Sequence, residues 1–302
     1  MSHISVLLNE TVNAVLAERQ TGIFIDATFG RGGHTRELLS RLDEQARVIA
    51  FDKDPQALAT AQQLAQEDAR FQIIHASFAE LKQQLQQHDI PVVDGIMADL
   101  GVSSPQLDQA ERGFSFMHDG PLDMRMDNSQ GQTAAQWLLS MDETDLANVI
   151  FKYGEERYSR RIARAIKQAG LIETTAQLAE IVKVAHPKWE KHKHPATRTF
   201  QAIRIAINKE LDDVENFLPQ AVEMLKPNGR LAVISFHSLE DRLIKQFIQK
   251  SSTLPEQDWG MPQHIDNRTL KKIARIAPSD VEVKQNPRSR SAWLRVAERL
   301  GA

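Results

Sequence analysis

Short apolar runs alternate with amphipathic stretches along the first hundred residues of the chain. Apolar runs of strand length occupy residues 23–25, 48–51, 71–75 and 92–99, and leucines at helical spacing predict helices at 5–18, 34–42 and 79–87. Strands that are apolar on both faces are typical of a parallel sheet covered by helices on each side. The pattern therefore predicts an α/β fold.

A long gap interrupts this alternation. The next strand is expected only at 230–236, after a helix at 214–226, so about 130 residues separate the fourth and fifth strands. A simple crossover needs a few dozen residues, so we expect an inserted domain. Apolar residues at 137–139, 146–150, 162–166 and 178–182 repeat at helical spacing, which predicts that the insert is all-helical. We place it at 108–212, between α/β segments 1–107 and 213–302.

The end of the chain supplies the remaining strands. Residues 251–278 are polar and irregular apart from a basic segment at 268–275, so they are predicted to form a mobile loop. Residues 281–284 and 292–297 are predicted to be two closing strands. Seven strands with the last pair adjacent in sequence is the plan of a Rossmann-like class I methyltransferase.

A glycine-rich turn follows the first strand. Gly30, Gly32 and Gly33 allow a tight turn in which a ligand can approach main-chain N–H groups at the start of a helix. Asp52 ends the second strand, 22 residues after Gly30, where an acid accepts hydrogen bonds from ribose hydroxyls. Thr35 replaces the third glycine of the dinucleotide fingerprint, and no phosphate-binding lysine follows, so the pattern favours S-adenosylmethionine as cofactor. A purely structural turn is the alternative.

Polar clusters follow two of the predicted strands, at the edge where α/β sheets bind ligands. Asp99, Ser103 and Ser104 are suited to holding an amino group by its N–H donors, which is the chemistry of methyl transfer to nitrogen. His237 is a second candidate for handling a proton, although a lone histidine at a strand end is more often structural. Phe78 follows the third strand, where its ring would lie against an adenine or belong to the core.

Charge is distributed unevenly along the 302 residues. The net charge is −3, but residues 152–209 carry 13 Lys and Arg against 5 Asp and Glu, which leaves about −11 on the remainder. One basic sector on an otherwise acidic protein predicts an anionic partner on one side. A solvated helix face explains the same charges equally well.

The chain has no cysteine. This excludes disulfides, thiolate zinc sites and cysteine nucleophiles, and it fits a cytoplasmic protein. Methyl transfers that activate a substrate ring through a cysteine adduct are therefore also excluded, which leaves an exocyclic nitrogen as the more accessible target. No signal peptide and no membrane span is expected.

His192 and His194 lack a third ligand at a plausible spacing, so no metal site is predicted.

These motifs resemble the bacterial 16S ribosomal RNA cytosine-N4 methyltransferases, the RsmH or MraW family, over nearly the whole chain. The motifs that carry the resemblance are 28–34 (TFGRGGH), 99–107 (DLGVSSPQL), 112–116 (RGFSF) with 121–126 (PLDMRM), 194–201 (HPATRTFQ), 235–242 (SFHSLEDR) and 286–291 (NPRSRS). The resemblance implies methyl transfer from S-adenosylmethionine to N4 of the cytidine at position 1402, in the decoding region of small-subunit RNA. It also implies that the helical insert helps to recognise RNA.

The resemblance also implies a set of site residues. The cofactor would be lined by Gly32, Gly33, His34, Asp52, Phe78, Asp99 and Gln106. Asp99, Ser103, Ser104 and His237 are the catalytic candidates, and Asp123 and Arg125 either orient the base or pair with each other. Phosphate contacts are expected from Lys191, Lys193, Arg198, Arg204, Arg288 and Arg290.

Other functions stay open on the sequence. The chain could methylate a small molecule or a protein, since helical inserts also build lids over such substrates. It could be an RNA-binding assembly factor that keeps a vestigial cofactor fold, or an N4 methyltransferase acting on DNA. The substrate could be naked RNA or the assembled small ribosomal subunit, and a homodimer is left open.

Overall fold

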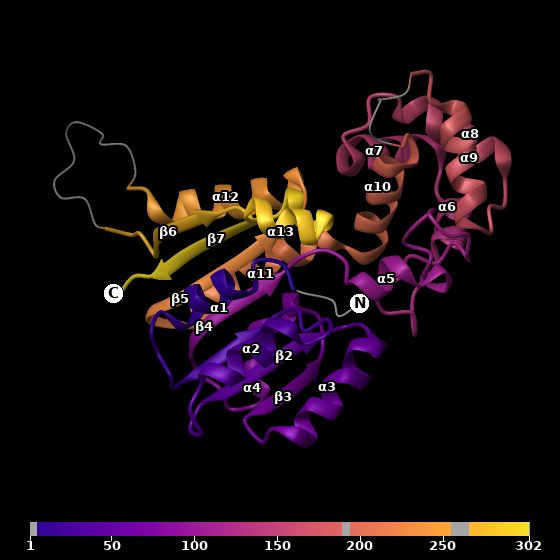
Figure 1. Ribbon diagram of the computed structural model, residues 1–302. Coiled ribbons are helices and arrows are strands. Elements are labelled where there is room, and N and C mark those ends of the chain that lie inside the picture. The colour runs from indigo at the N-terminus through magenta and orange to yellow at the C-terminus, as the bar shows by residue number, and fades with distance from the viewer. Residues whose placement is uncertain (1–4, 189–193, 255–265, 302) are drawn as a thin grey trace, which may run out of the picture. The chain divides into compact units, whose positions relative to one another are not determined.

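The computed structural model describes residues 5–188, 194–254 and 266–301 (Figure 1). It divides into two compact units, one made of Met1–Gly101 with Leu211–Ala302 and one of Val102–Glu210. The units divide at 101/102 and 210/211, six and two residues before the boundaries expected from the sequence. We call them the α/β unit and the helical unit.

A seven-stranded sheet forms the centre of the α/β unit, in the order β3-β2-β1-β4-β5-β7-β6. The strands are β1 Ile23–Asp26, β2 Arg47–Asp52, β3 Phe71–His75, β4 Val93–Asp99, β5 Leu225–Ser235, β6 Leu270–Ile276 and β7 Trp293–Arg299. The first five are parallel, and β7 is antiparallel to both β5 and β6. This topology confirms the Rossmann-like class I methyltransferase fold.

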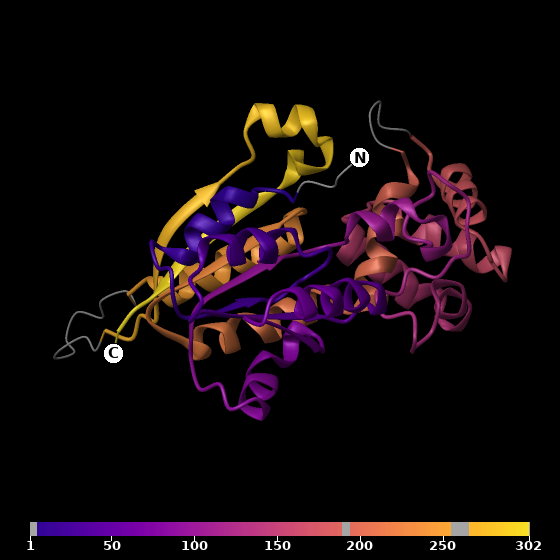
Figure 2. The ribbon, with the colours of Figure 1, turned by 60° about the horizontal axis from the view of Figure 1, so that its bottom comes forward.

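Helices cover both faces of the sheet (Figures 1 and 2). The helical segments are α1 Leu8–Leu16, α2 Gly33–Arg41, α3 Pro55–Glu67, η1 Phe78–Glu80, α4 Leu81–Gln87, α11 Glu210–Met224, α12 Ser238–Ser252, α13 Asp280–Gln285 and η3 Pro287–Ser291. One core cluster packs α4, α11 and α12 on the sheet, and the other packs α1, α2 and α3. Among the described residues, no helix is long and apolar enough to cross a membrane.

The predicted end of the chain was partly wrong. The basic segment expected within a loop is strand β6, and residues 281–284, expected to be a strand, lie in helix α13. In β6 only Leu270 is buried, whereas Lys271 and Lys272 are exposed at the edge of the sheet. Charged residues are common on edge strands because they discourage pairing with other chains, so the polar sequence concealed a strand. The predicted closing strand at 292–297 is confirmed as β7.

The helical unit contains the predicted insert. Its helical segments are α5 Ser104–Asp108, η2 Ala110–Arg112, α6 Ala134–Ser140, α7 Glu143–Gly154, α8 Ser159–Ala169, α9 Thr175–Ala185 and α10 Ala196–Asn208. The four segments with helical spacing fall in α6, α7, α8 and α9, as predicted. Their buried faces join those of α10 in a separate apolar core that includes Leu146, Ile162, Leu178 and Ile203.

Candidate active site

Three acidic residues end neighbouring parallel strands. Asp26 ends β1, Asp52 ends β2 and Asp99 ends β4, and β1 pairs with both of the other strands. Because parallel strands all end at the same edge of the sheet, the topology brings these carboxyl groups together at the edge where α/β folds bind ligands. The sequence predicted this edge as the cofactor site.

The glycine turn is tied to Asp52. The Gly30 N–H donates to Asp52 Oδ2 at 2.8 Å, and the Asp54 N–H donates to Oδ1 at 2.8 Å. Burial raises the pKa of Asp52 above its usual value, while these backbone bonds lower it. Each carboxylate oxygen keeps a further lone pair, so Asp52 can still accept hydrogen bonds from a ribose.

Gly32 occupies the tightest part of the turn. Its φ is +76°, and a Cβ at this position would lie 2.6 Å from the ring of Phe29, which is buried. Only glycine meets both conditions without strain. The following helix α2 begins at Gly33, which leaves main-chain N–H groups at its start for an anionic part of a ligand.

Asp26 holds the two sides of the glycine turn together. Its Oδ1 accepts from the Thr28 N–H at 3.1 Å, and its Oδ2 accepts from the Thr35 hydroxyl at 2.6 Å. The residue is 2 % exposed, and this burial raises the pKa of Asp26 to about 6. The sequence marked Asp26 only as a strand end, although an acid between an apolar strand and two threonines is itself a signal for a hydrogen-bonded turn.

Asp99 has one carboxylate oxygen without a partner. Oδ1 is buried and makes no hydrogen bond with any residue that the structure describes, although the side chain is 28 % exposed as a whole. The Asp99 N–H donates to Thr28 Oγ1 at 2.6 Å, which fixes the backbone at this position. Burial, followed by the charges of Asp26 and Glu240, raises the pKa of Asp99 well above its usual value. A buried unpaired acceptor at the ligand edge is suited to an incoming N–H donor.

His34 lies beside Asp99. Its Nε2 is 3.1 Å from the Val6 carbonyl oxygen, and because a carbonyl only accepts, Nε2 carries a proton. The Nδ1 of His34 lies 3.8 Å from Asp99 Oδ2. The ring is 6 % exposed and sits in the first turn of α2, so it forms one wall around the carboxyl group.

The ring of Phe78 packs against the core on one side and is partly exposed on the other. Its ring packs edge-on against Phe217 at a centroid distance of 5.3 Å and contacts the core of the α/β unit. Next to it, Asp213 accepts from Ser77 Oγ at 3.0 Å and from Lys53 Nζ at 2.9 Å. Both interpretations of the sequence therefore remain compatible with this position, and stacking on adenine stays a prediction.

His237 caps a helix. It is the N-cap of α12, where Nδ1 accepts from the Glu240 N–H at 3.5 Å and Nε2 lies 3.2 Å from Glu240 Oε1. Glu240 is 1 % exposed and also accepts from the Phe236 N–H at 2.9 Å. These contacts favour the structural interpretation of His237 that the sequence left open.

Three of the residues predicted to bind the cofactor or to act in catalysis belong to the helical unit. Ser103 is the N-cap of α5, and its N–H donates to Gln106 Oε1 at 2.9 Å, which forms a capping box with Gln106. Ser104 is the first residue of the helix, and Gln106 is 5 % exposed. The grouping of these residues with Asp99 stays a prediction.

The residues predicted to bind RNA differ in their surroundings. Arg204 forms two 2.8 Å contacts with Glu210, and Arg198 lies 3.7 Å from the buried Glu156. Both guanidinium groups therefore have a structural partner within the helical unit. Arg288 and Arg290 are exposed on η3. Lys191 and Lys193 lie outside the described residues.

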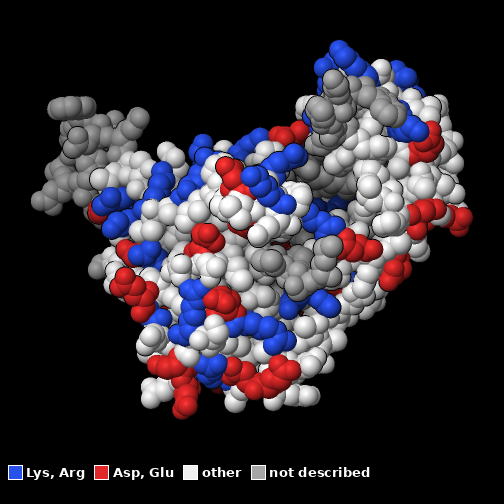
Figure 3. All heavy atoms as spheres, viewed as in Figure 1, with Lys and Arg blue, Asp and Glu red and all other residues white. Residues whose placement is uncertain are grey.

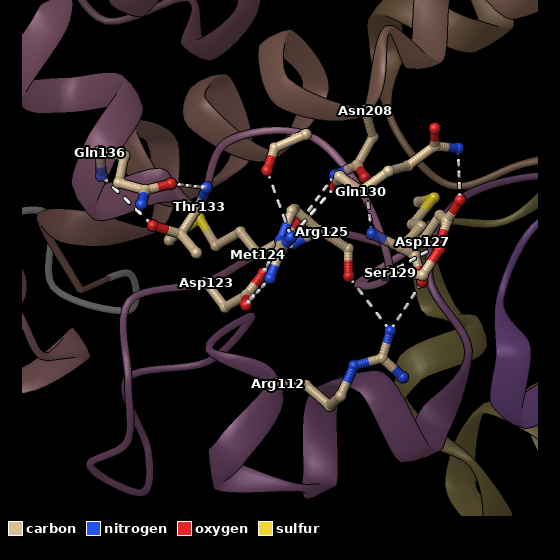
Figure 4. Close-up of polar contacts among 12 residues, drawn as sticks. Arg112, Asp123, Met124, Arg125, Asp127, Ser129, Gln130, Thr133, Gln136 and Asn208 are labelled. Carbon is tan, nitrogen blue, oxygen red and sulfur yellow. Dashed lines mark hydrogen bonds and ion pairs between the residues drawn. The ribbon is translucent and has the colours of Figure 1, made fainter.

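Asp123 and Arg125 form an ion pair, with N–O distances of 2.8 Å and 2.7 Å (Figure 4). Arg112 Nη2 donates to the carbonyl oxygens of Arg125 and Met126, and Asn208 bonds the backbone at Met124 and Met126. The motif residues in this segment thus hold a long loop on η2 and α10. Pairing within the loop is the simpler of the two roles expected for Asp123 and Arg125.

Comparison with known proteins adds the family. The model of the MraW methylase family matches residues 1–300. The chain is 78% identical to Ribosomal RNA small subunit methyltransferase H of Acinetobacter baumannii, covering 99% of this chain and 98% of the relative, and 55% identical to the protein of that name from Psychrobacter arcticus, covering 98% and 94%. An rRNA methylase structure from Streptococcus thermophilus matches at 13% identity and a TM-score of 0.46, covering 99% and 100%. On the family match and these sequence identities, the chain belongs to the MraW methylase family, whose members are S-adenosylmethionine-dependent methyltransferases.

Proposed function

We propose that the protein methylates N4 of the cytidine at position 1402 in the decoding region of 16S ribosomal RNA, acting in the cytoplasm on RNA within the small ribosomal subunit. The relatives at 78% and 55% identity are both small-subunit ribosomal RNA methyltransferases by name, which supports the substrate class. The observation that best supports methylation of a nitrogen atom is the unpaired Oδ1 of Asp99, because this oxygen can accept an N–H from an amino group.

The residues at the strand ends fit S-adenosylmethionine. Asp52 offers acceptors for the two ribose hydroxyls, and the start of α2 after Gly32 offers N–H donors for the carboxylate of the methionine part. Phe78 offers a partly exposed ring shortly after β3, whose last residue, His75, pairs with Asp52. When bound, the cofactor supplies a sulfonium methyl group that is electrophilic without further activation.

The protein's task is then to prepare the nucleophile. The N4 lone pair of cytosine is delocalised into the ring, so a hydrogen-bond acceptor on one N–H favours a pyramidal nitrogen and stabilises the positive charge that develops on it. Asp99 can provide this acceptor. As the new N–C bond would form, the S–C bond of the sulfonium would break and leave S-adenosylhomocysteine. N4 must then lose one proton, and the raised pKa of Asp99 makes its carboxylate a better proton acceptor than an ordinary aspartate.

Other acceptors are less suited to this role. His237 Nδ1 is taken up by the Glu240 N–H at the start of α12. His237 Nε2 makes no hydrogen bond with the described residues, but it lies 3.2 Å from Glu240 Oε1, a carboxylate oxygen that competes for any proton it would bind. The hydroxyl groups of Ser103 and Ser104 are weak bases, although either could orient the amino group. The cytosine must also leave its stack to reach the site, at a cost of a few kcal/mol that RNA contacts elsewhere must offset.

The direct test is to incubate the purified protein with S-adenosylmethionine and small ribosomal subunits lacking the modification, with deproteinised 16S RNA in parallel. We expect N4-methylated cytidine in nuclease digests by mass spectrometry, and sequencing of RNA fragments should place it at position 1402. A methyl group on C5, or on a different nucleotide, would contradict the proposal. Methylation of a protein or small molecule in place of RNA would favour the alternative function.

A further inference from the structure

Helices α8 and α9 of the helical unit enclose a groove of about 720 Å³ that none of the predicted site residues lines. Arg161, Arg164 and Gln168 line it from α8, and Ile181 and Val184 line it from α9, with Leu171 from the segment between the helices. On each helix the spacing of three or four residues places these side chains on one face. The volume is that of a small-molecule or nucleotide site.

Part of the groove wall is made of apolar side chains that are exposed to solvent. Val184 is 71 % exposed and Leu171 is 58 % exposed, although the opposite faces of the same helices are buried in the core at Ile162, Leu178 and Val182. Exposed aliphatic side chains gathered at one groove indicate a surface that is covered by a ligand or partner.

Arginines gather along α8, and two of them, Arg161 and Arg164, line the groove. Arg160, Arg161 and Arg164 are exposed on α8, and Arg157 just before the helix is exposed and lies over the ring of Tyr158. The side chains of Arg160 and Arg161 form no hydrogen bond or ion pair with any residue in the described part of the chain, and the side chain of Arg164 has only a 3.4 Å contact with the exposed Glu143. Figure 3 shows Lys and Arg atoms over the region where Figure 1 labels α8.

We propose that this groove binds an unstacked nucleotide of the RNA substrate, with the base against Leu171 and Val184 and the phosphates on the arginines of α8. The inference rests on the proposed function and names the surface of the insert that contacts RNA. Sequence-specific RNA recognition mostly targets single-stranded segments whose bases stack on aromatic rings or guanidinium planes, and flipped-out bases also pack against apolar side chains.

Charge and chemistry favour RNA over other occupants. Arginine pairs with phosphate through two parallel N–H groups and also stacks on bases, so Arg161 and Arg164 can serve both parts of a nucleotide. Gln168 adds an amide that can hydrogen-bond a base edge. The acidic residue of the groove, Glu180, is neutralised by Lys183 at 2.7 Å, so it does not oppose phosphate.

The test compares charge reversal and apolar substitution inside the groove with matched changes outside it. Arg161→Glu and Val184→Asp alter the groove. Arg47→Glu in the α/β unit makes the same charge reversal elsewhere, and Phe151→Asp on α7 replaces another exposed apolar residue by aspartate. Affinity for a decoding-region 16S RNA transcript is measured by fluorescence anisotropy at several salt concentrations. Circular dichroism and S-adenosylmethionine binding confirm that each variant is folded.

We expect Arg161→Glu and Val184→Asp each to weaken RNA binding by about tenfold or more, since one charged contact is worth about that factor. Arg161→Glu should also reduce the slope of log affinity against log salt by about 0.7. For methylation, KM for RNA should rise while kcat at saturating RNA is retained. The controls should match the wild type.

Photocrosslinking of 4-thiouridine-substituted RNA gives an independent readout. Crosslinks should map to peptides from α8 and α9 and disappear in Val184→Asp. The groove assignment fails if the wild type binds and methylates RNA while both groove variants do so with unchanged KM and salt slope. It also fails if the groove crosslinks to a ribosomal protein in the assembled subunit. A wild-type protein that neither binds nor methylates RNA would instead overturn the proposed function.

Discussion

Asp99 shows how burial prepares a single side chain for chemistry. The Thr28 hydroxyl fixes its backbone, His34 stands beside one oxygen, and the other oxygen is left without a partner among the described residues. Leaving a buried acceptor unpaired costs about 1–3 kcal/mol, and at the ligand edge of the sheet a bound N–H donor would remove that cost. The raised pKa has the same origin, because burial disfavours the ionised form.

Asp99→Asn tests this role with little change in shape. We expect kcat to fall about 100-fold or more, because general-base catalysis is typically worth a factor of 10²–10⁴. Wild-type activity should rise with pH as Asp99 ionises, and the variant should lack that rise. Asp89→Asn, at an exposed position with φ +57° that asparagine also tolerates, is the matched control. Full activity in Asp99→Asn would remove Asp99 from the mechanism.

Several individual residues were accessible from the sequence and others were not. Asp52 and the glycines could be placed because strand ends and positive φ angles leave clear signals in a sequence. The double role of Asp26 was missed because it depends on Thr28 and Thr35 folding back over the strand end. The capping box of Ser103 and Gln106 was missed for the same reason, since hydroxyl and amide side chains serve ligands and helix ends equally well.

At the scale of elements, strands buried on both faces were predicted well and exposed ones were not. Strands β1 to β4 each contain a run of buried apolar residues, whereas β6 exposes Lys271, Lys272 and Arg275 at the sheet edge. Helix α13 was predicted wrongly for a different reason, because its sequence resembles that of a strand. Its valines at 281 and 283 alternate with acidic or basic residues as in a strand, but Ser279 caps the first turn by accepting from the Glu282 N–H.

The turn between β1 and α2 yields a prediction about two neighbouring glycines. Gly30 and Gly32 both have positive φ, but a Cβ on Gly30 would meet no atom within 4 Å, whereas one on Gly32 would meet the Phe29 ring. Gly30→Ala should therefore lose only the cost of a left-handed residue, about 1–2 kcal/mol of unfolding free energy. Gly32→Ala should lose about 1–3 kcal/mol more through overpacking.

Urea unfolding followed by circular dichroism measures both losses, and isothermal titration with S-adenosylmethionine shows whether the turn still binds its ligand. Gly30→Ala is the matched control, because it shares the backbone strain without the collision. Equal losses in the two variants would mean that the Phe29 ring moves aside at no cost.

For the whole molecule, the buried acids make stability depend on pH. The pKa of Asp26 is about 6 in the folded protein, against an ordinary value of 3.8. A raised folded-state pKa means that the folded form binds the proton more tightly, so the stabilisation is complete below about pH 4 and is lost as pH rises to about 6. The full shift corresponds to about 3 kcal/mol as an upper figure.

The comparison of wild type with Asp26→Asn isolates this effect from the other carboxylates. We expect the unfolding free energy of the wild type, relative to the variant, to fall by about 2–3 kcal/mol between pH 4 and pH 7. Denaturant titrations at a series of pH values measure the difference. A difference that does not change with pH would show that Asp26 stays ionised throughout, and that its hydrogen bonds with Thr28 and Thr35 outweigh its burial.

The insertion of the helical unit between β4 and β5 also has a consequence for biogenesis. Strand β4 ends at Asp99, and its partner β5 begins at Leu225, so more than 120 residues are translated before β4 can pair on that side. At about 5–20 residues per second, the open strand waits about 6–25 s on the ribosome. The helical unit, with its own core, can fold within this interval, whereas the α/β unit closes only when the last strands emerge. The nascent chain therefore exposes an apolar strand edge that a ribosome-associated chaperone is suited to shield.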